Sequence, residues 1–212
     1  MINANADAMG IIFPNNYDKF VPELVSERLM ASIPFASRYR MIDFLLSSMV
    51  GCGIDKIEVL VRENYHSLVD HLGGGREWDL SRKNGGLSIF PPFAQKSIGS
   101  MGGGRVEALA NILPVLKKQK EKYVIMADTN IAANFDFNAL IAQHVKTDAD
   151  ITFAYTKEEL PQELTGAKDA SKGLYYTLKL DGDKVEDIYI NKQEQGVQNF
   201  SMNIYIANRE WL

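Results

Sequence analysis

The chain has 212 residues, of which 46% are hydrophobic and 24% are charged, and its formal net charge at pH 7 is −4. This composition is typical of a globular protein whose core is large enough to fold without disulfides or a structural metal. The acidic balance excludes a broad attraction to nucleic acid or to an anionic membrane, and no apolar run approaches the roughly 18 residues of a membrane-spanning helix.

Short apolar runs rich in β-branched residues alternate with helical patterns over the first part of the chain. Strands are predicted at residues 9–13, 56–61, 87–90, 123–127 and 150–155. The spacing of apolar side chains predicts helices over 41–50, 65–72, 105–118 and 137–145, the first capped by Ser37 and the third kinked at Pro114. This order predicts an α/β fold: a Rossmann-like, mixed but mostly parallel sheet with helices on both faces.

The pattern changes after Thr156. A charged, loop-like stretch reaches Lys172, and two strands then flank the turn residues Asp181-Gly182-Asp183, which favour a β-hairpin. A last strand is predicted over 201–207. Parallel strands followed by a hairpin indicate one sheet with an antiparallel edge.

Asp128 directly follows the apolar strand 123–127. Ligands of such sheets gather at the carboxyl ends of the strands, and a carboxylate there can hold Mg²⁺. Aspartate is also common as the cap of a following turn, so both interpretations stay open.

Two loops bear on phosphate binding. The glycine-rich loop 99–104 could bring backbone N–H groups close to a phosphate or a sugar, or it could be an exposed surface loop. The turn 13–18 after the first strand contains no glycine, although a phosphate-wrapping turn needs glycines for close backbone approach.

The segment at residues 34–44, Pro-Phe-Ala-Ser-Arg-Tyr-Arg-Met-Ile-Asp-Phe, resembles the P-F-x-x-[KR]-[YF]-R-[ILM]-I-D-F segment of bacterial glucose-1-phosphate adenylyltransferases. Segments 123–125 and 201–205 follow in the family's order, so the resemblance runs from about Met9 to Leu212. It implies the nucleotide-diphospho-sugar transferase fold and a reaction in which ATP and glucose 1-phosphate give ADP-glucose and pyrophosphate. It also implies that residues 1–212 form one nucleotidyltransferase-like domain of a longer protein, whose C-terminal left-handed β-helix domain is absent from this chain.

The resemblance suggests which residues contact ligands. The G-T-A-D-A segment of the family is similar to residues 104–108, which marks Gly104 and Glu107 as substrate-binding. A late E-K pair becomes Asn191-Lys192, so Lys192 is retained as a sugar-phosphate contact. The S-M-G segment becomes 201–203, which retains Ser201 and places an asparagine where the family has glycine. The S-G-D-H segment makes Asp128 a vestigial catalytic or Mg²⁺-binding residue.

Departures from the family are concentrated at the phosphate loop. The G-G-x-G-x-R-L loop after the first strand is replaced by residues 13–17, and Met30 stands where the K-P-A-V lysine falls. Removing one well-placed donor typically costs on the order of 10²–10³ in rate. We therefore expect a regulatory, catalytically impaired subunit of glycogen biosynthesis, similar to the GlgD-type members of the family. Its partner would be a catalytic subunit that binds Mg²⁺.

Two alternatives stay open. The chain could be an active nucleotidyltransferase with an atypical phosphate loop, or a non-catalytic sensor of a sugar phosphate or nucleotide. The single cysteine, Cys52, and an N-terminus without a signal-peptide pattern favour a cytoplasmic location.

Overall fold

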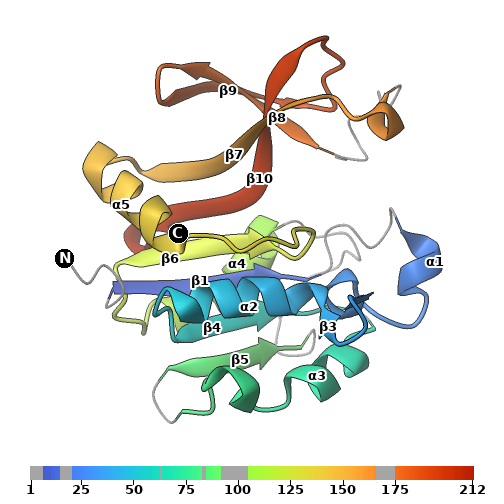
Figure 1. Ribbon diagram of the computed structural model, residues 1–212. Helices are drawn as coiled ribbons and strands as arrows, with labels where there is room; N and C mark the ends of the chain where they lie inside the picture. Colours follow the sequence, from blue (N-terminus) through green and yellow to red (C-terminus); the bar gives the residue numbers. More distant parts are fainter. Residues whose placement is uncertain (1–6, 15–20, 63, 83–84, 92–104, 166–174) are drawn as a thin grey trace. The chain divides into compact units, whose positions relative to one another are not determined.

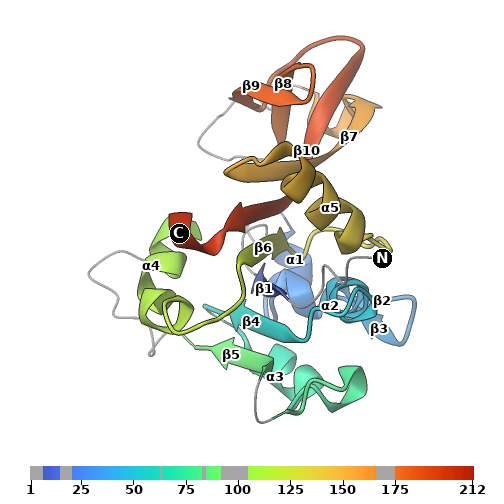
Figure 2. The same ribbon diagram turned by 90° about the vertical axis from the view of Figure 1, so that its left-hand side faces the viewer.

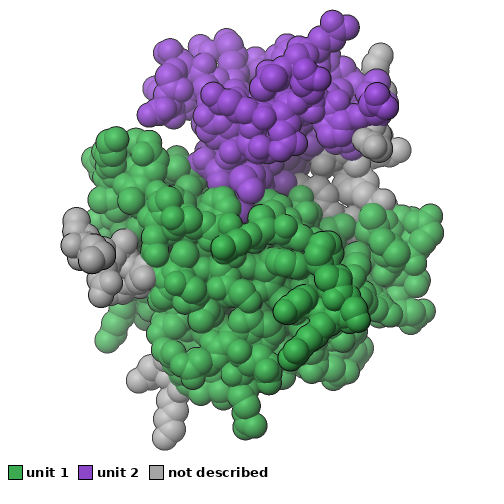
Figure 3. Space-filling model, in the orientation of Figure 1, with its two compact units in different colours: residues 1–152, 205–212 green, residues 153–204 purple. Residues whose placement is uncertain are grey.

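The computed structural model describes residues 7–14, 21–62, 64–82, 85–91, 105–165 and 175–212. The chain divides into two compact units (Figure 3). Unit 1 comprises Met1–Thr152 and Tyr205–Leu212, and unit 2 comprises Phe153–Ile204.

Unit 1 is built on a parallel sheet with the strand order β5-β4-β1-β6 (Figure 1). Its strands are β1 (Ala8–Phe13), β4 (Lys56–Leu60), β5 (Gly86–Phe90) and β6 (Tyr123–Asp128). Every residue of β1 and β6 is buried, as their unbroken apolar sequences predicted. The next strand in the order is β10 (Val197–Asn208), whose last residues belong to unit 1.

Helices cover both faces of this sheet (Figure 2). On one face Ala108, Ile112 and Leu116 of α4 pack with alternate residues of β1 and β6. On the other face Gly10 of β1 lies so close to α2 that an added Cβ would come within 2.7 Å of Met49 Sδ. The helices and 3₁₀ turns are α1 (Pro22–Val25), η3 (Met30–Ser32), α2 (Met41–Gly51), α3 (His66–Leu72), η4 (Arg76–Trp78), α4 (Arg105–Leu116), α5 (Phe137–Thr147) and η8 (Arg209–Trp211).

Unit 2 is largely antiparallel. Strands β8 (Tyr176–Asp181) and β9 (Lys184–Ile190) form the predicted hairpin, with Gly182 at φ +59° in its turn. Strand β10 pairs antiparallel with β8 and also pairs with β7 (Ile151–Glu159), and the short turn η6 (Gln162–Leu164) follows β7. Parallel strands followed by an antiparallel hairpin confirm the predicted mixed sheet.

Two local predictions were wrong. Ser37 does not cap the second helix: it lies at φ +71° between the short strands β2 (Pro34–Phe35) and β3 (Tyr39–Arg40), and the helix begins at Met41. The Asp43 carboxylate accepts the Arg40 N–H at 3.0 Å, so an acidic residue inside the first turn satisfies the helix start instead. Strand β7 continues to Glu159 through the charged residues predicted as loop, because an exposed paired strand tolerates polar side chains.

Among the described residues, none of the helices combines the length and apolar character needed to cross a membrane.

Candidate functional site

The carboxyl edge of the unit 1 sheet holds the buried carboxylate Asp128. It is the last residue of β6 and lies in register with Phe13, the last residue of β1. Its side chain is 1% exposed. The next residue, Thr129, donates its hydroxyl to the Pro14 carbonyl at 3.4 Å, so the two strand ends are tied together. Asp128 thus lies where ligands gather in this class of sheet.

Arg105, the first residue of α4, holds both oxygens of this carboxylate. Its Nε donates to Asp128 Oδ1 at 3.2 Å, and its Nη2 forms an ion pair with Oδ2. The guanidinium carbon also lies 5.8 Å from the centre of the Tyr205 ring. A two-point arginine–carboxylate contact is among the strongest polar interactions in proteins. The charge of Asp128 is therefore balanced from within unit 1.

This arrangement does not fit a divalent cation. Magnesium needs near-octahedral oxygen coordination, usually with one or two free carboxylates. Both oxygens of Asp128 already receive hydrogen bonds from Arg105. In the part of the chain that the structure describes, no group of three or more histidine, cysteine, aspartate or glutamate side chains gathers that could hold a metal.

Of the other residues predicted in unit 1, only Glu107 belongs to the part of the chain that the structure describes. Gly104, the rest of the glycine-rich loop, and Asn15 and Asn16 of the first turn lie outside the described residues. Glu107 lies in the first turn of α4 and is half-buried. Its role in substrate binding stays a prediction.

The two predicted residues of unit 2 have partners within that unit. Lys192 forms an ion pair with Glu194 at 2.7 Å, and its ammonium lies 3.8 Å from the centre of the Tyr189 ring. The Ser201 hydroxyl oxygen accepts the Asn203 N–H at 3.1 Å.

Two asparagines in these segments have left-handed backbone conformations. Asn191 lies at φ +52° and Asn203 at φ +54°. The Asn191 side chain accepts the Tyr175 N–H at 3.2 Å, while its own N–H donates to the Tyr175 carbonyl at 3.1 Å. Asparagine tolerates this conformation better than other residues with a side chain. The Asn203 backbone is therefore one that glycine could also adopt.

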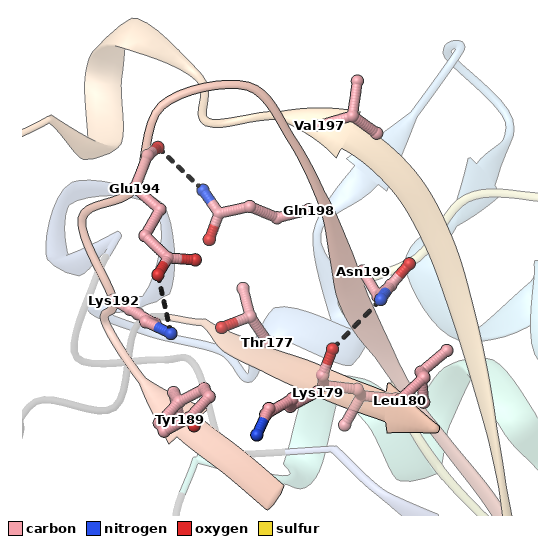
Figure 4. A pocket seen from close by; sticks show the side chains of 10 residues that line it. Thr177, Lys179, Leu180, Tyr189, Lys192, Glu194, Val197, Gln198 and Asn199 are labelled. Atoms are coloured by element: carbon pink, nitrogen blue, oxygen red, sulfur yellow. Dashed lines mark hydrogen bonds and ion pairs between the residues drawn. The ribbon is translucent and has the colours of Figure 1, made fainter. Parts of the chain in front are cut away.

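Unit 2 contains a pocket of about 350 Å³ beside the β8–β9 hairpin (Figure 4). It brings Lys192 together with residues that sequence reasoning had not singled out, whereas Ser201 is not part of its lining. Its lining residues are Thr177, Leu178, Lys179, Leu180, Tyr189, Lys192, Glu194, Val197, Gln198 and Asn199.

Two buried oxygens of this pocket's lining lack hydrogen-bond partners. They are the Thr177 hydroxyl and the side-chain oxygen of Gln198, on residues that are 3% and 8% exposed. The Gln198 amide nitrogen donates to the Glu194 carbonyl at 3.0 Å, and the Gln198 side-chain oxygen takes no part in this contact. An unsatisfied buried polar group costs about 1–3 kcal/mol. A hydroxylated ligand could both donate to the Gln198 oxygen and accept from Thr177.

The segment that carries the family resemblance, residues 34–44, connects α2 to α3 through side-chain contacts. Arg40 donates Nη1 to the Ser67 carbonyl at 2.6 Å and to the Ser67 hydroxyl at 2.7 Å. Asp43 Oδ1 lies 2.6 Å from His71 Nε2. These contacts fasten the start of α2 to α3, so the segment contributes to architecture within the described residues.

Comparison with known proteins gives the following likenesses. The family model described as Nucleotidyl transferase matches residues 23–167. The glycogen biosynthesis protein GlgD of Geobacillus stearothermophilus is 36% identical over 151 residues, which cover 70% of this chain and 43% of that protein. The glucose-1-phosphate adenylyltransferase of Clostridium novyi (strain NT) is 33% identical over 187 residues, which cover 87% of this chain and 46% of that enzyme. The chain therefore spans less than half the length of these relatives.

A crystal structure from Bacillus anthracis, described as a glucose-1-phosphate thymidylyltransferase in complex with sucrose, matches with a TM-score of 0.69 at 13% identity. The match covers 96% of this chain and 72% of that one. Together with the strand order, this likeness confirms the predicted fold class.

Proposed function

The chain belongs to the nucleotidyl transferase family, and on that premise we propose that it is the N-terminal part of a regulatory subunit that has lost its own catalysis. The partner in this proposal is a catalytic glucose-1-phosphate adenylyltransferase, and the process is glycogen biosynthesis. The similarity to proteins named GlgD supports the process, and a cytoplasmic location is part of the proposal.

The observation that carries the loss of catalysis is the Arg105–Asp128 pair. Nucleotidyl transfer depends on cations positioned against phosphate charge. Here the carboxylate at the strand edge is already neutralised by a guanidinium. The sequence supports the same conclusion, because residues 13–17 contain no glycine and position 30 holds a methionine where the family has a lysine. Such losses do not simply add, but together they remove several orders of magnitude in rate.

The test is an assay of the full-length protein with ATP, Mg²⁺ and glucose 1-phosphate, alone and mixed with its catalytic homologue. We expect no ADP-glucose from the protein alone and a changed kcat or KM of the homologue in the mixture. The control is the homologue mixed with the thermally unfolded protein. Steady turnover by the protein alone that Asp128→Asn abolishes would instead establish an active transferase with an atypical loop.

The unit 2 pocket favours a second candidate function, the sensing of a sugar phosphate without chemistry. Its unpartnered oxygens on Thr177 and Gln198 suit ligand hydroxyls, and Lys192 suits a phosphate. Calorimetry with glucose 1-phosphate tests this candidate. We expect binding to be lost in Lys192→Met and kept in Lys184→Met, a matched change on the exposed strand β9. Absence of binding to any hexose phosphate or nucleotide would leave the purely regulatory function.

A further inference from the structure

The ion pair between Arg105 and Asp128 occupies the carboxylate at the carboxyl edge of the unit 1 sheet. We infer that the Arg105 guanidinium takes the place of a divalent cation at Asp128 and keeps such cations out. The side chain is a built-in counter-ion, fixed at the point where a metal would otherwise meet the strand end.

The geometry leaves little of the carboxylate for a metal. Each Asp128 oxygen contacts a different guanidinium nitrogen, and the side chain is 1% exposed. A cation that bound there would have to displace Arg105, whose side chain is 26% exposed and lies against the Tyr205 ring. Displacement would leave a partly buried guanidinium without its counter-charge, which is strongly unfavourable.

The chemistry of arginine makes the exclusion of cations independent of pH. The guanidinium stays protonated at every physiological pH. Its ion pair with Asp128 therefore does not weaken with pH, as a pair made by a histidine or a lysine could. A buried carboxylate without a counter-charge is costly and would attract a cation. Removing the Arg105 side chain should therefore convert Asp128 from an excluded into an accessible metal ligand.

The inference extends the proposed regulatory role, but its test needs neither nucleotide nor partner, so the two can fail separately. The probe is Mn²⁺ alone, followed by electron paramagnetic resonance of the free ion in the full-length protein. The variants are Arg105→Thr, Arg105→Lys and Arg105→Thr combined with Asp128→Asn. The matched control is Arg82→Thr, because Arg82 forms exposed pairs with Asp55 and Asp79, each at 2.7 Å.

We expect Arg105→Thr to bind Mn²⁺ roughly tenfold or more tightly than the unmodified protein, since the freed carboxylate is desolvated. Asp128→Asn in the same chain should abolish that gain. Arg105→Lys and Arg82→Thr should bind no more Mn²⁺ than the unmodified protein. Arg105→Gln, which keeps more of the aliphatic stem than threonine does, replaces Arg105→Thr if circular dichroism shows that the threonine variant is unfolded.

Two results would overturn the inference. One is Mn²⁺ binding by the unmodified protein that Asp128→Asn removes. The other is a folded Arg105→Thr or Arg105→Gln variant that gains no Mn²⁺ affinity.

Discussion

The substitution Asp128→Asn should lower the free energy of unfolding far more than a comparable substitution at the exposed pair of Asp55 and Arg82. The change removes one charge from a pair whose carboxylate is buried and whose guanidinium is 26% exposed. Breaking a fully buried pair costs about 3–5 kcal/mol, and an exposed pair contributes about 0–1 kcal/mol. The partial exposure of Arg105 places the coupling between these limits, at about 2–3 kcal/mol.

A double-mutant cycle measures this coupling. Urea unfolding of Asp128→Asn, Arg105→Thr and the double variant gives the interaction energy directly. A loss of about 2–3 kcal/mol corresponds to roughly 4–12 °C in Tm for a chain of this size. The parallel cycle at Asp55 and Arg82, where the side chains are 54% and 41% exposed, should give a much smaller coupling.

The salt dependence separates the two cycles further. Exposed pairs are screened at an ionic strength of about 1 M, whereas buried pairs are screened much less. The reasoning fails if the coupling between Asp128 and Arg105 is no larger than that of the surface pair, or if salt removes both equally.

Three further changes test the packing of unit 1. Burial raises the pKa of the Glu58 carboxyl, so its ionised form opposes folding. Glu58→Gln should raise the urea midpoint at pH 7 and lose that advantage at pH 4, unlike the exposed control Glu77→Gln. Burial lowers the pKa of His144, so stability should fall as pH drops below about 6.5. The urea midpoint of His144→Gln should fall less between pH 7.5 and 5, and an equal fall would contradict this reasoning. Gly86→Ala adds a Cβ that collides with a backbone oxygen at φ +81° and should lower the unfolding free energy by about 2 kcal/mol or more. Gly182→Ala, at φ +59° in open space, should cost about 1 kcal/mol in the same measurement.

The elements of the fold could be predicted from the sequence because their signals are local. Unbroken apolar runs identified β1 and β6, and an Asp-Gly-Asp turn identified the β8–β9 hairpin. The burial of Glu58 could not be predicted in this way, because it depends on the neighbouring strands. Residues 56–61 were predicted as a strand without any statement about Glu58, yet β4 lies between β1 and β5 and Glu58 is 2% exposed.

The chemistry of the site depended on contacts that periodicity does not reveal. Asp128 was identified as the carboxylate at a strand end, but Arg105 lies 23 residues earlier and carries no pattern that pairs the two. The unpartnered oxygens of Thr177 and Gln198 likewise arise only when strands from different parts of unit 2 pack together. Sequence alone predicts the residue types near a ligand, whereas packing determines which of them remain available.

At Asn203, inside strand β10, the left-handed backbone conformation does not depend on one particular side chain. Both glycine and asparagine occupy this region of backbone space, so an exchange between them leaves the strand path intact. Mutational drift between these two residues can therefore change the side chain that is buried at this point of β10 while the scaffold stays constant. A protein engineer who wishes to remove a buried amide from unit 2 can start at this residue without redesigning the sheet.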